Sequence, residues 1–118
     1  MKPGDDEHIK GFIMNKVYSF RAWVKPGGRP HRHHSTINLQ KGYPKHHRGK
    51  FNNLIKELNR NRLIHLFPHH GNGLHASALL SKQAVSEGIR LANGFRVSVG
   101  LPPWDESFRE ILDEFSSW

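Results

Sequence analysis

No aspartate or glutamate occurs from His8 to Lys56, and this absence limits the possible folds of the chain more than any other feature. The same stretch holds eleven basic residues: Lys10, Lys16, Arg21, Lys25, Arg29, Arg32, Lys41, Lys45, Arg48, Lys50 and Lys56. Charges of one sign repel one another unless a partner neutralises them. Nucleic acid is the obvious polyanion, because each neutralised phosphate releases a condensed counterion. The stretch therefore predicts a surface directed at a polyanion; the plainer alternative is the solvated face of a basic protein.

The rest of the composition narrows the class of protein. The chain has 118 residues, with 18 Lys+Arg against 10 Asp+Glu and a formal charge of +8. This length fits one domain with a modest core. The absence of cysteine excludes disulfide frameworks, cysteine zinc sites and thiol catalysis. No apolar run approaches the ~20 residues of a membrane-spanning helix, and the polar start has no signal-peptide pattern. We expect an intracellular, cytoplasmic protein without membrane contact.

The first part of the chain alternates between apolar and polar side chains. We expect a disordered terminus over residues 1–8 and a single α+β domain over residues 9–118. Within residues 9–25 six apolar side chains share one parity, namely Phe12, Met14, Tyr18, Phe20, Ala22 and Val24, whereas the polar Asn15, Ser19, Arg21 and Lys25 lie on the other. Period-two alternation with aromatic and β-branched residues predicts a long strand here.

Residues 26–50 predict a long basic loop or arm between this strand and the next element. Prolines and glycines interrupt the segment from Pro26 onward, which ends the strand. A short strand is expected within it at residues 36–39. Loops of this length are uncommon in compact domains and are typically functional or disordered.

Two apolar stripes at helical spacing predict two amphipathic helices. The first consists of Phe51, Leu54, Ile55 and Leu58, and the second of Phe108, Ile111, Leu112 and Phe115. Asp105 or Ser107 is the expected N-cap of the second helix. Between them, residues 63–67 predict a buried strand, and residues 74–80 fit a strand or a short helix.

Residues 82–99 allow two interpretations. Ser81 caps a helix that either continues to Ala92 or ends at Gly88. In the second case Asn93-Gly94 forms the tight turn of a β hairpin, which we favour because this dipeptide is the strongest short hairpin signal. Residues 76–86 also have the spacing of the second half of a helix-turn-helix with that hairpin as its wing. The glycine common in such a turn is missing, so we favour a core helix and predict an antiparallel sheet with a central and a C-terminal helix.

The predicted nucleic-acid interface combines the basic loop with the polar side of the central helix. Its residues are Arg29, Arg32, Lys41, Tyr43, Lys45, Arg48, Lys50, Lys56, Arg60 and Arg62. Arginine binds phosphate with two parallel hydrogen bonds, lysine supplies a point charge, and the ring of Tyr43 would stack on unpaired bases. No base-reading motif is visible, so backbone contacts are expected. We favour RNA slightly over DNA because the loop is long and irregular.

Histidines supply an alternative function. The chain contains ten, and His69, His70 and His75 surround a glycine-containing turn. Paired imidazoles with a nearby cation suffice for metal-independent ribonuclease chemistry, with one ring as base and the other as acid. These three histidines are the catalytic candidates under that hypothesis, and we expect no metal and no cofactor.

A third hypothesis is a protein-interaction module. The basic stretch would then dock on an acidic partner, for example as an inhibitor of a nucleic-acid enzyme. The acidic C-terminal helix could also face a protein partner, although a solvated helix face is its plainer interpretation.

Overall fold

The elements follow one another in an α+β order. A computed structural model describes residues 2–30, 32–71 and 73–116. In chain order its elements are α1 (Asp6–Ser19), β1 (Trp23–Val24), β2 (His34–Ser35), α2 (Thr36–Gln40), the 3-10 helix η1 (Lys45–His47), α3 (Arg48–Arg60), β3 (Ile64–Pro68), β4 (Leu74–Leu79), α4 (Lys82–Ser98) and α5 (Glu106–Ser116). The α+β class predicted from the sequence is confirmed. None of the described helices is long and apolar enough to cross a bilayer.

Strand β4 is the centre of a four-stranded mixed sheet. Along one edge it pairs antiparallel with β3, so that β3 and β4 form a hairpin. Along the other edge β2 pairs antiparallel with the start of β4, and β1 pairs parallel with its end. The sheet is therefore mixed, and the expectation of a purely antiparallel sheet was wrong.

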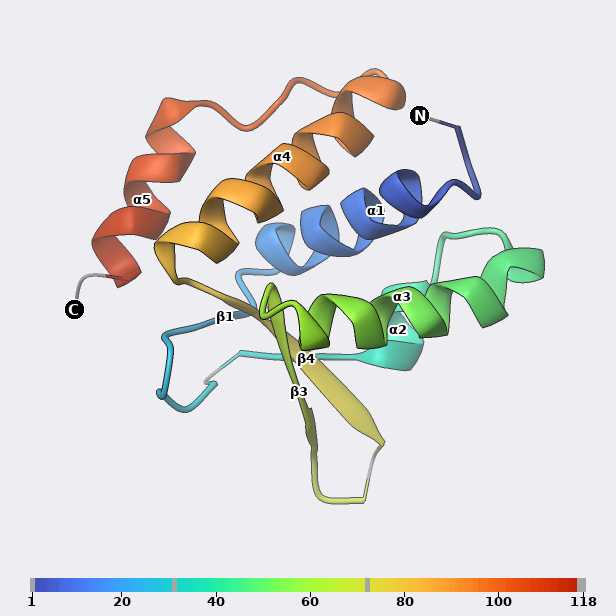
Figure 1. The fold of residues 1–118 in the computed structure, drawn as a ribbon, viewed down its shortest axis with the longest axis horizontal. Coiled ribbons are helices and arrows are strands. Elements are labelled where there is room, and N and C mark those ends of the chain that lie inside the picture. Colours follow the sequence, from blue (N-terminus) through green and yellow to red (C-terminus); the bar gives the residue numbers. More distant parts are fainter. Residues whose placement is uncertain (1, 31, 72, 117–118) are drawn as a thin grey trace.

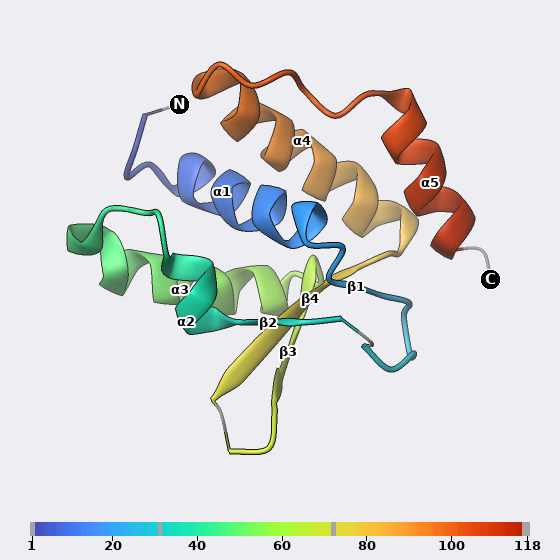
Figure 2. The same cartoon turned by 180° about the vertical axis from the view of Figure 1, so that it is seen from behind.

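The two faces of the sheet differ in what covers them. Ile64, Ala76 and Ala78 share one face by register and are fully buried in the core that the helices complete. His65 is exposed and lies opposite Ser77 on the other face. Figures 1 and 2 show the β3–β4 hairpin extending away from the helices on the side of α3 opposite α1. The hairpin is thus a projecting element with a free end.

Helices α1 and α4 approach each other closely. The closeness depends on glycine, because a Cβ on Gly11 would lie 2.4 Å from the backbone oxygen of Leu91. On the other helix, a Cβ on Gly88 would lie 2.0 Å from the hydroxyl oxygen of Tyr18. Apolar side chains of α1 then fill the core on both sides of the contact.

Residues 9–25 do not form the predicted strand, because most of them belong to α1. This helix is buried against α4, α3 and the sheet, with Ile9, Ile13, Met14 and Val17 fully buried. A helix buried on several sides has apolar residues around most of its circumference, so its 3.6-residue period is hidden. Residues 6–8, expected in a disordered terminus, form its first turn.

The predicted hairpin at Asn93-Gly94 was also wrong, since α4 continues through both residues to Ser98. A tertiary contact explains why the turn signal fails. Asn93 Oδ1 accepts a hydrogen bond from the Trp104 N–H, and Asn93 Nδ2 donates to the Trp104 carbonyl at 3.2 Å. The side chain that would favour a turn is used to fix the segment before α5. A continuous α4 also leaves no wing at residues 93–99 for the helix-turn-helix considered there.

Other predicted elements are confirmed. The central helix is α3, the strand at 63–67 corresponds to β3, and the ambiguous residues 74–80 form β4. Ser81 caps α4 by accepting from the Ala84 N–H at 3.2 Å. Asp105 caps α5 through the Phe108 N–H at 3.2 Å. Both helix starts therefore have side-chain caps of the predicted kind.

Candidate nucleic-acid interface

The segment from Ser35 to Arg60 is two helices joined by a tight turn. The Ser35 hydroxyl accepts from the Asn38 N–H at 3.1 Å and caps α2, so residues 36–39 form a helix rather than the predicted strand. Four residues, 41–44, separate α2 from η1, which runs directly into α3. Gly42 sits in this turn at φ +90°, a conformation that favours glycine. We call residues 35–60 the helix-turn-helix, because two helices joined by a short glycine-containing turn have the connectivity of that motif.

A lysine from another helix holds this turn in place. Lys16 of α1 donates hydrogen bonds from Nζ to the backbone oxygens of Asn38, Leu39 and Lys41. Partial burial lowers the pKa of Lys16, with a smaller contribution from the positive charge of Lys41. The apolar pattern of α1 is interrupted at Lys16 because its ammonium group caps the end of α2.

Replacing Lys16 by methionine is expected to destabilise the fold by about 1–2 kcal/mol, because three carbonyls lose a charged donor while the stem volume is kept. The measurement is the free energy of unfolding in urea. Lys56→Met, which makes the same change on the exposed side of α3, should alter it by less than about 0.5 kcal/mol. Equal effects of the two changes would show that Lys16 has no special structural role.

Helix α3 divides into a buried and an exposed side. Phe51, Leu54, Ile55 and Leu58 pack into the core. Opposite them lie Gly49, Asn52, Asn53, Lys56 and Arg60, and all five are exposed. Asn52 accepts a hydrogen bond from the Gln40 side chain, which joins it to α2. This exposed side is long, continuous and polar.

Ion pairing separates the cations around α3 into two groups. On the side toward α1, Lys50 pairs with Asp6 at 2.9 Å, and Glu57 pairs with Lys10 at 3.1 Å. By contrast, Arg48, Lys56 and Arg60 are exposed and have no ion pair or side-chain hydrogen bond with the described residues. We call these three cations, together with Asn52 and Asn53, the basic face of α3.

The structure places the ten predicted interface residues in four different settings, one of which is the buried position of Tyr43. Seven of the ten are exposed side chains without a described salt bridge and with no hydrogen bond from their charged groups: Arg29, Arg32, Lys41, Lys45, Arg48, Lys56 and Arg60. Arg62 is also exposed but lies at the bend after α3, with φ +61°, on the wall of a groove of about 790 Å³. Glu7 and Glu87 line the same groove, so it carries both signs of charge. Lys50 is used internally, as described above.

Tyr43 was wrongly predicted as a surface for bases to stack on. Its side chain is only 8% exposed and packs against Phe12 and Phe51. Its oxygen accepts from the Gly4 N–H at 2.8 Å and lies 2.8 Å from His8 Nδ1. Burial raises the pKa of the Tyr43 hydroxyl. The residue ties the start of the chain to the helix-turn-helix.

The β3–β4 hairpin follows α3 directly and closes with a glycine-rich turn. His69 N–H donates to the Gly73 oxygen at 3.2 Å, and His70, Gly71 and Gly73 all have positive φ. Asn59 of α3 accepts from the Leu66 N–H at 3.1 Å, which fixes β3 to the end of the helix. A helix-turn-helix followed by a projecting hairpin is therefore the arrangement at this side of the molecule (Figures 1 and 2).

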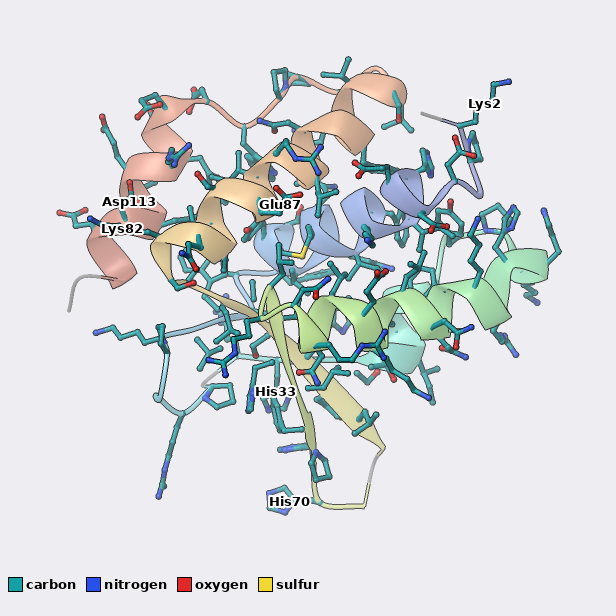
Figure 3. All side chains as sticks on the ribbon, in the orientation of Figure 1. Lys2, His33, His70, Lys82, Glu87 and Asp113 are labelled. Atoms are coloured by element: carbon teal, nitrogen blue, oxygen red, sulfur yellow. The ribbon has the colours of Figure 1, made fainter. Side chains whose placement is uncertain are left out.

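Three imidazoles lie together on the face of this hairpin opposite the helical core. His33 Nδ1 and His75 Nδ1 are 2.9 Å apart, within hydrogen-bond distance. The ring of His69 lies 4.3 Å from that of His33 and 4.8 Å from that of His75, between centroids. Phe67 contacts His33 edge-on at 5.1 Å. We call His33, His69 and His75 the histidine cluster; Figure 3 shows His33 beside the hairpin and His70 at its free end.

A segment crossing the sheet carries His33 to this position. The Ser77 hydroxyl donates to the Arg32 carbonyl at 2.7 Å, and Ser77 is completely buried. This hydrogen bond holds Arg32, and with it the neighbouring His33, against the face of the sheet that carries Ser77. The predicted catalytic candidates His69 and His75 are thus brought together, with His33 as an unpredicted third member.

The geometry of the cluster favours binding over catalysis. Acid–base cleavage of RNA needs two imidazoles on opposite sides of a phosphodiester. Here the ring centroids are 4.3–4.8 Å apart, so the rings touch and no phosphodiester fits between them. The described residues also contain no group of three or more His, Cys, Asp or Glu side chains that could hold a metal ion. Ribonuclease activity remains a prediction.

Comparison with protein-family models, with curated proteins and with solved structures found no match to this chain. The class of site is therefore defined by its own geometry, a helix-turn-helix with an exposed basic second helix and a projecting hairpin.

Helix α2 was not predicted from the sequence, and the asparagines of the basic face were not among the predicted interface residues. Three local signals mark the unit: Ser35 as an N-cap, Gly42 in the turn, and Pro44 just before the next helical turn. Asn52 and Asn53 lie on the polar side of a correctly predicted helix, but only the turn before that helix shows why they matter. The signal was local, yet α2 is too short to show a period.

Proposed function

We propose that the protein binds duplex DNA, with α3 in the major groove and the β3–β4 hairpin beside it along the phosphate backbone. In a helix-turn-helix the second helix enters the major groove and the first crosses the backbone. Helix α3 has thirteen residues and is about 20 Å long. An α-helix is about 10–12 Å across with its side chains, which fits a major groove about 12 Å wide.

The side chains on the basic face of α3 match both kinds of DNA contact. Asparagine forms two hydrogen bonds with adenine in the major groove, and Asn53 is exposed at the centre of the free side. Arginine reads guanine or binds phosphate, which suits Arg48 near the start of α3. Lys56 and Arg60 are then placed for phosphates farther along the groove.

The single observation that carries the proposal is the distribution of unpaired charge. Carboxylates neutralise Lys10, Lys50 and Arg90, whereas the cations of the basic face stay unpaired among the described residues. The acidic helix α5 packs beside α4, and α1 separates that pair from α3 (Figure 1). The exposed side of α3 therefore presents positive charge without local competition.

Duplex DNA replaces the slight preference for RNA expected from the sequence. That preference depended on residues 26–50 being one long irregular loop. Much of that stretch is folded into β2, α2, η1 and the start of α3, so a rigid helix carries the charge. A-form RNA has a deep, narrow major groove that side chains cannot read, and this disfavours insertion of α3 there.

The experiment is equilibrium binding of the full chain to labelled DNA duplexes of mixed sequence, in EDTA, across a range of salt concentrations. We expect log Kd to rise linearly with log salt with a slope of about 4 or more, from Arg48, Lys56, Arg60 and loop cations. A matched RNA duplex should bind more weakly at each salt concentration. Salt-independent binding, or equal binding to both duplexes, would contradict the proposal.

A docking partner that is a protein is the alternative outcome. It would be supported if no duplex binds at low salt while an acidic partner remains bound after nuclease treatment. The same samples report on cleavage, because a full-length RNA strand recovered after incubation in EDTA excludes metal-independent ribonuclease activity.

A further inference from the structure

We propose that the histidine cluster is a phosphate-binding site that contacts the backbone of the bound nucleic acid and takes up protons as it does so. The inference depends on the proposed function and adds a second, pH-dependent contact to the basic face of α3. It assigns a ligand class, the phosphodiester anion, to a group of side chains that helix insertion does not use.

The position of the cluster connects it to the interface. His33 follows Arg32, whose exposed guanidinium has no described partner, and His69 precedes the tip of the hairpin. The hairpin itself is fixed to the last turn of α3 through Asn59 and Leu66. A duplex seated on α3 therefore lies on the side from which the hairpin projects.

The hydrogen bond within the cluster requires an uncharged partner. Of the two Nδ1 atoms of His33 and His75, one must donate and the other must offer a lone pair. His75 Nε2 is buried without a hydrogen-bond partner among the described residues, so a proton there would be unsatisfied. This assigns the proton of His75 to Nδ1, donating to His33, and the proton of neutral His33 to Nε2.

The surroundings of the cluster contain positive charge and no described carboxylate. Positive charge on His69, His75 or His70 lowers the pKa of His33, and the charges of Lys16 and Lys41 lower the pKa of the neighbouring His34. Phe67 and Ser77 supply uncharged walls, and Arg32 lies next in the chain. An anion would relieve the mutual repulsion that protonated rings experience here.

Burial lowers the pKa of His33, and the charges of His69, His75 and His70 lower it further. The pKa of His69 is lowered in the same direction, by desolvation and by His70 and His75. The free protein therefore keeps the rings of His33 and His69 neutral at pH values where an ordinary imidazole is already protonated. A bound phosphate favours the charged form and raises both pKa values, so protons are taken up on binding.

The sign of the effect follows from this difference. Well above the pKa of the bound state the rings are neutral in both states, and pH has no effect through them. As the pH falls through the bound-state pKa the complex gains protons that the free protein lacks, so affinity rises until the free-state pKa is passed.

The test compares Kd for one DNA duplex from about pH 8 to about pH 5.5 at constant salt and with EDTA present. We expect the wild-type affinity to increase about tenfold over this range, and the double variant His33→Gln, His69→Gln to change by less than about twofold. The control variant His46→Gln, His47→Gln removes two histidines of η1 and should keep the wild-type response.

A second measurement keeps the test independent of folding defects. NMR titration of the wild-type imidazoles should show the pKa of His69 rising when the duplex is added, and circular dichroism should show the native helix content in both variants. The inference fails if the cluster variant keeps the full pH response or if the pKa of His69 does not rise. Absence of DNA binding at every pH would instead overturn the proposed function itself.

Discussion

Replacing Gly11 by alanine is expected to destabilise the protein by about 3 kcal/mol or more. The added Cβ would lie 2.4 Å from the Leu91 oxygen and 2.8 Å from the Phe95 Cβ. The first of these is a backbone atom of α4, so no side-chain rotation relieves the contact. The two helices must separate, and the core between them loses its packing.

A matched substitution tests the same change where space is free. Gly49 lies in α3, and a Cβ there meets nothing within 4 Å. Gly49→Ala should therefore stabilise the protein by about 0.5–1 kcal/mol, because alanine is the better helix former. Urea unfolding monitored by circular dichroism measures both changes. A Gly11→Ala variant as stable as the wild type would contradict the close packing of α1 and α4.

Removing the three cations of the basic face should weaken DNA binding on the order of 100-fold at moderate salt. The variant is Arg48→Gln, Lys56→Gln, Arg60→Gln, which keeps polarity and helix propensity while removing charge. These side chains have no described internal partner, so the free energy of unfolding should change by less than about 1 kcal/mol. The slope of log Kd against log salt should also fall by about 2–3.

The control removes charge from distant parts of the surface. Lys2 and Lys82 lie well apart from the hairpin and from each other in Figure 3, and Lys2→Gln, Lys82→Gln should change Kd by less than about threefold. If this control weakens binding as strongly per charge as the α3 variant does, net charge alone governs affinity. The basic face would then not be a binding site.

The amino-acid sequence predicts those elements that have one buried and one solvent-exposed side. Helix α3 buries its whole apolar stripe, and α5 buries Phe108 and Leu112 of its stripe while Ile111 is exposed. Both helices expose their polar side, so their periods are visible in the sequence. Helices α1 and α4 pack on each other and on the sheet, and their apolar residues spread around the helix. For α1 this spread happened to imitate the alternation of a strand.

The sequence predicted many of the residues of the candidate site but not how the fold arranges them. Unpaired cations on α3 follow from an acid-free stretch that crosses a helix, and this reasoning needed no fold. The buried Tyr43, the internally paired Lys50 and the turn at Gly42 depend on contacts between distant residues. The histidine cluster likewise joins His33 and His75, which are 42 positions apart, through a crossing segment fixed at Ser77.

The sheet forms late in folding, because it needs strand β4. Among the described residues β1, β2 and β3 each pair with β4 and not with one another. Strand β1 pairs only through contacts such as Trp23 with Ala78, and β2 through contacts such as His34 with Ala76. Neither strand has a partner until β4 is in place. Pairings between such distant positions carry a large loop-closure entropy and slow folding. During synthesis the helix-turn-helix leaves the ribosome before β4 does. The sheet beside it can form only when residues 74–79 have followed.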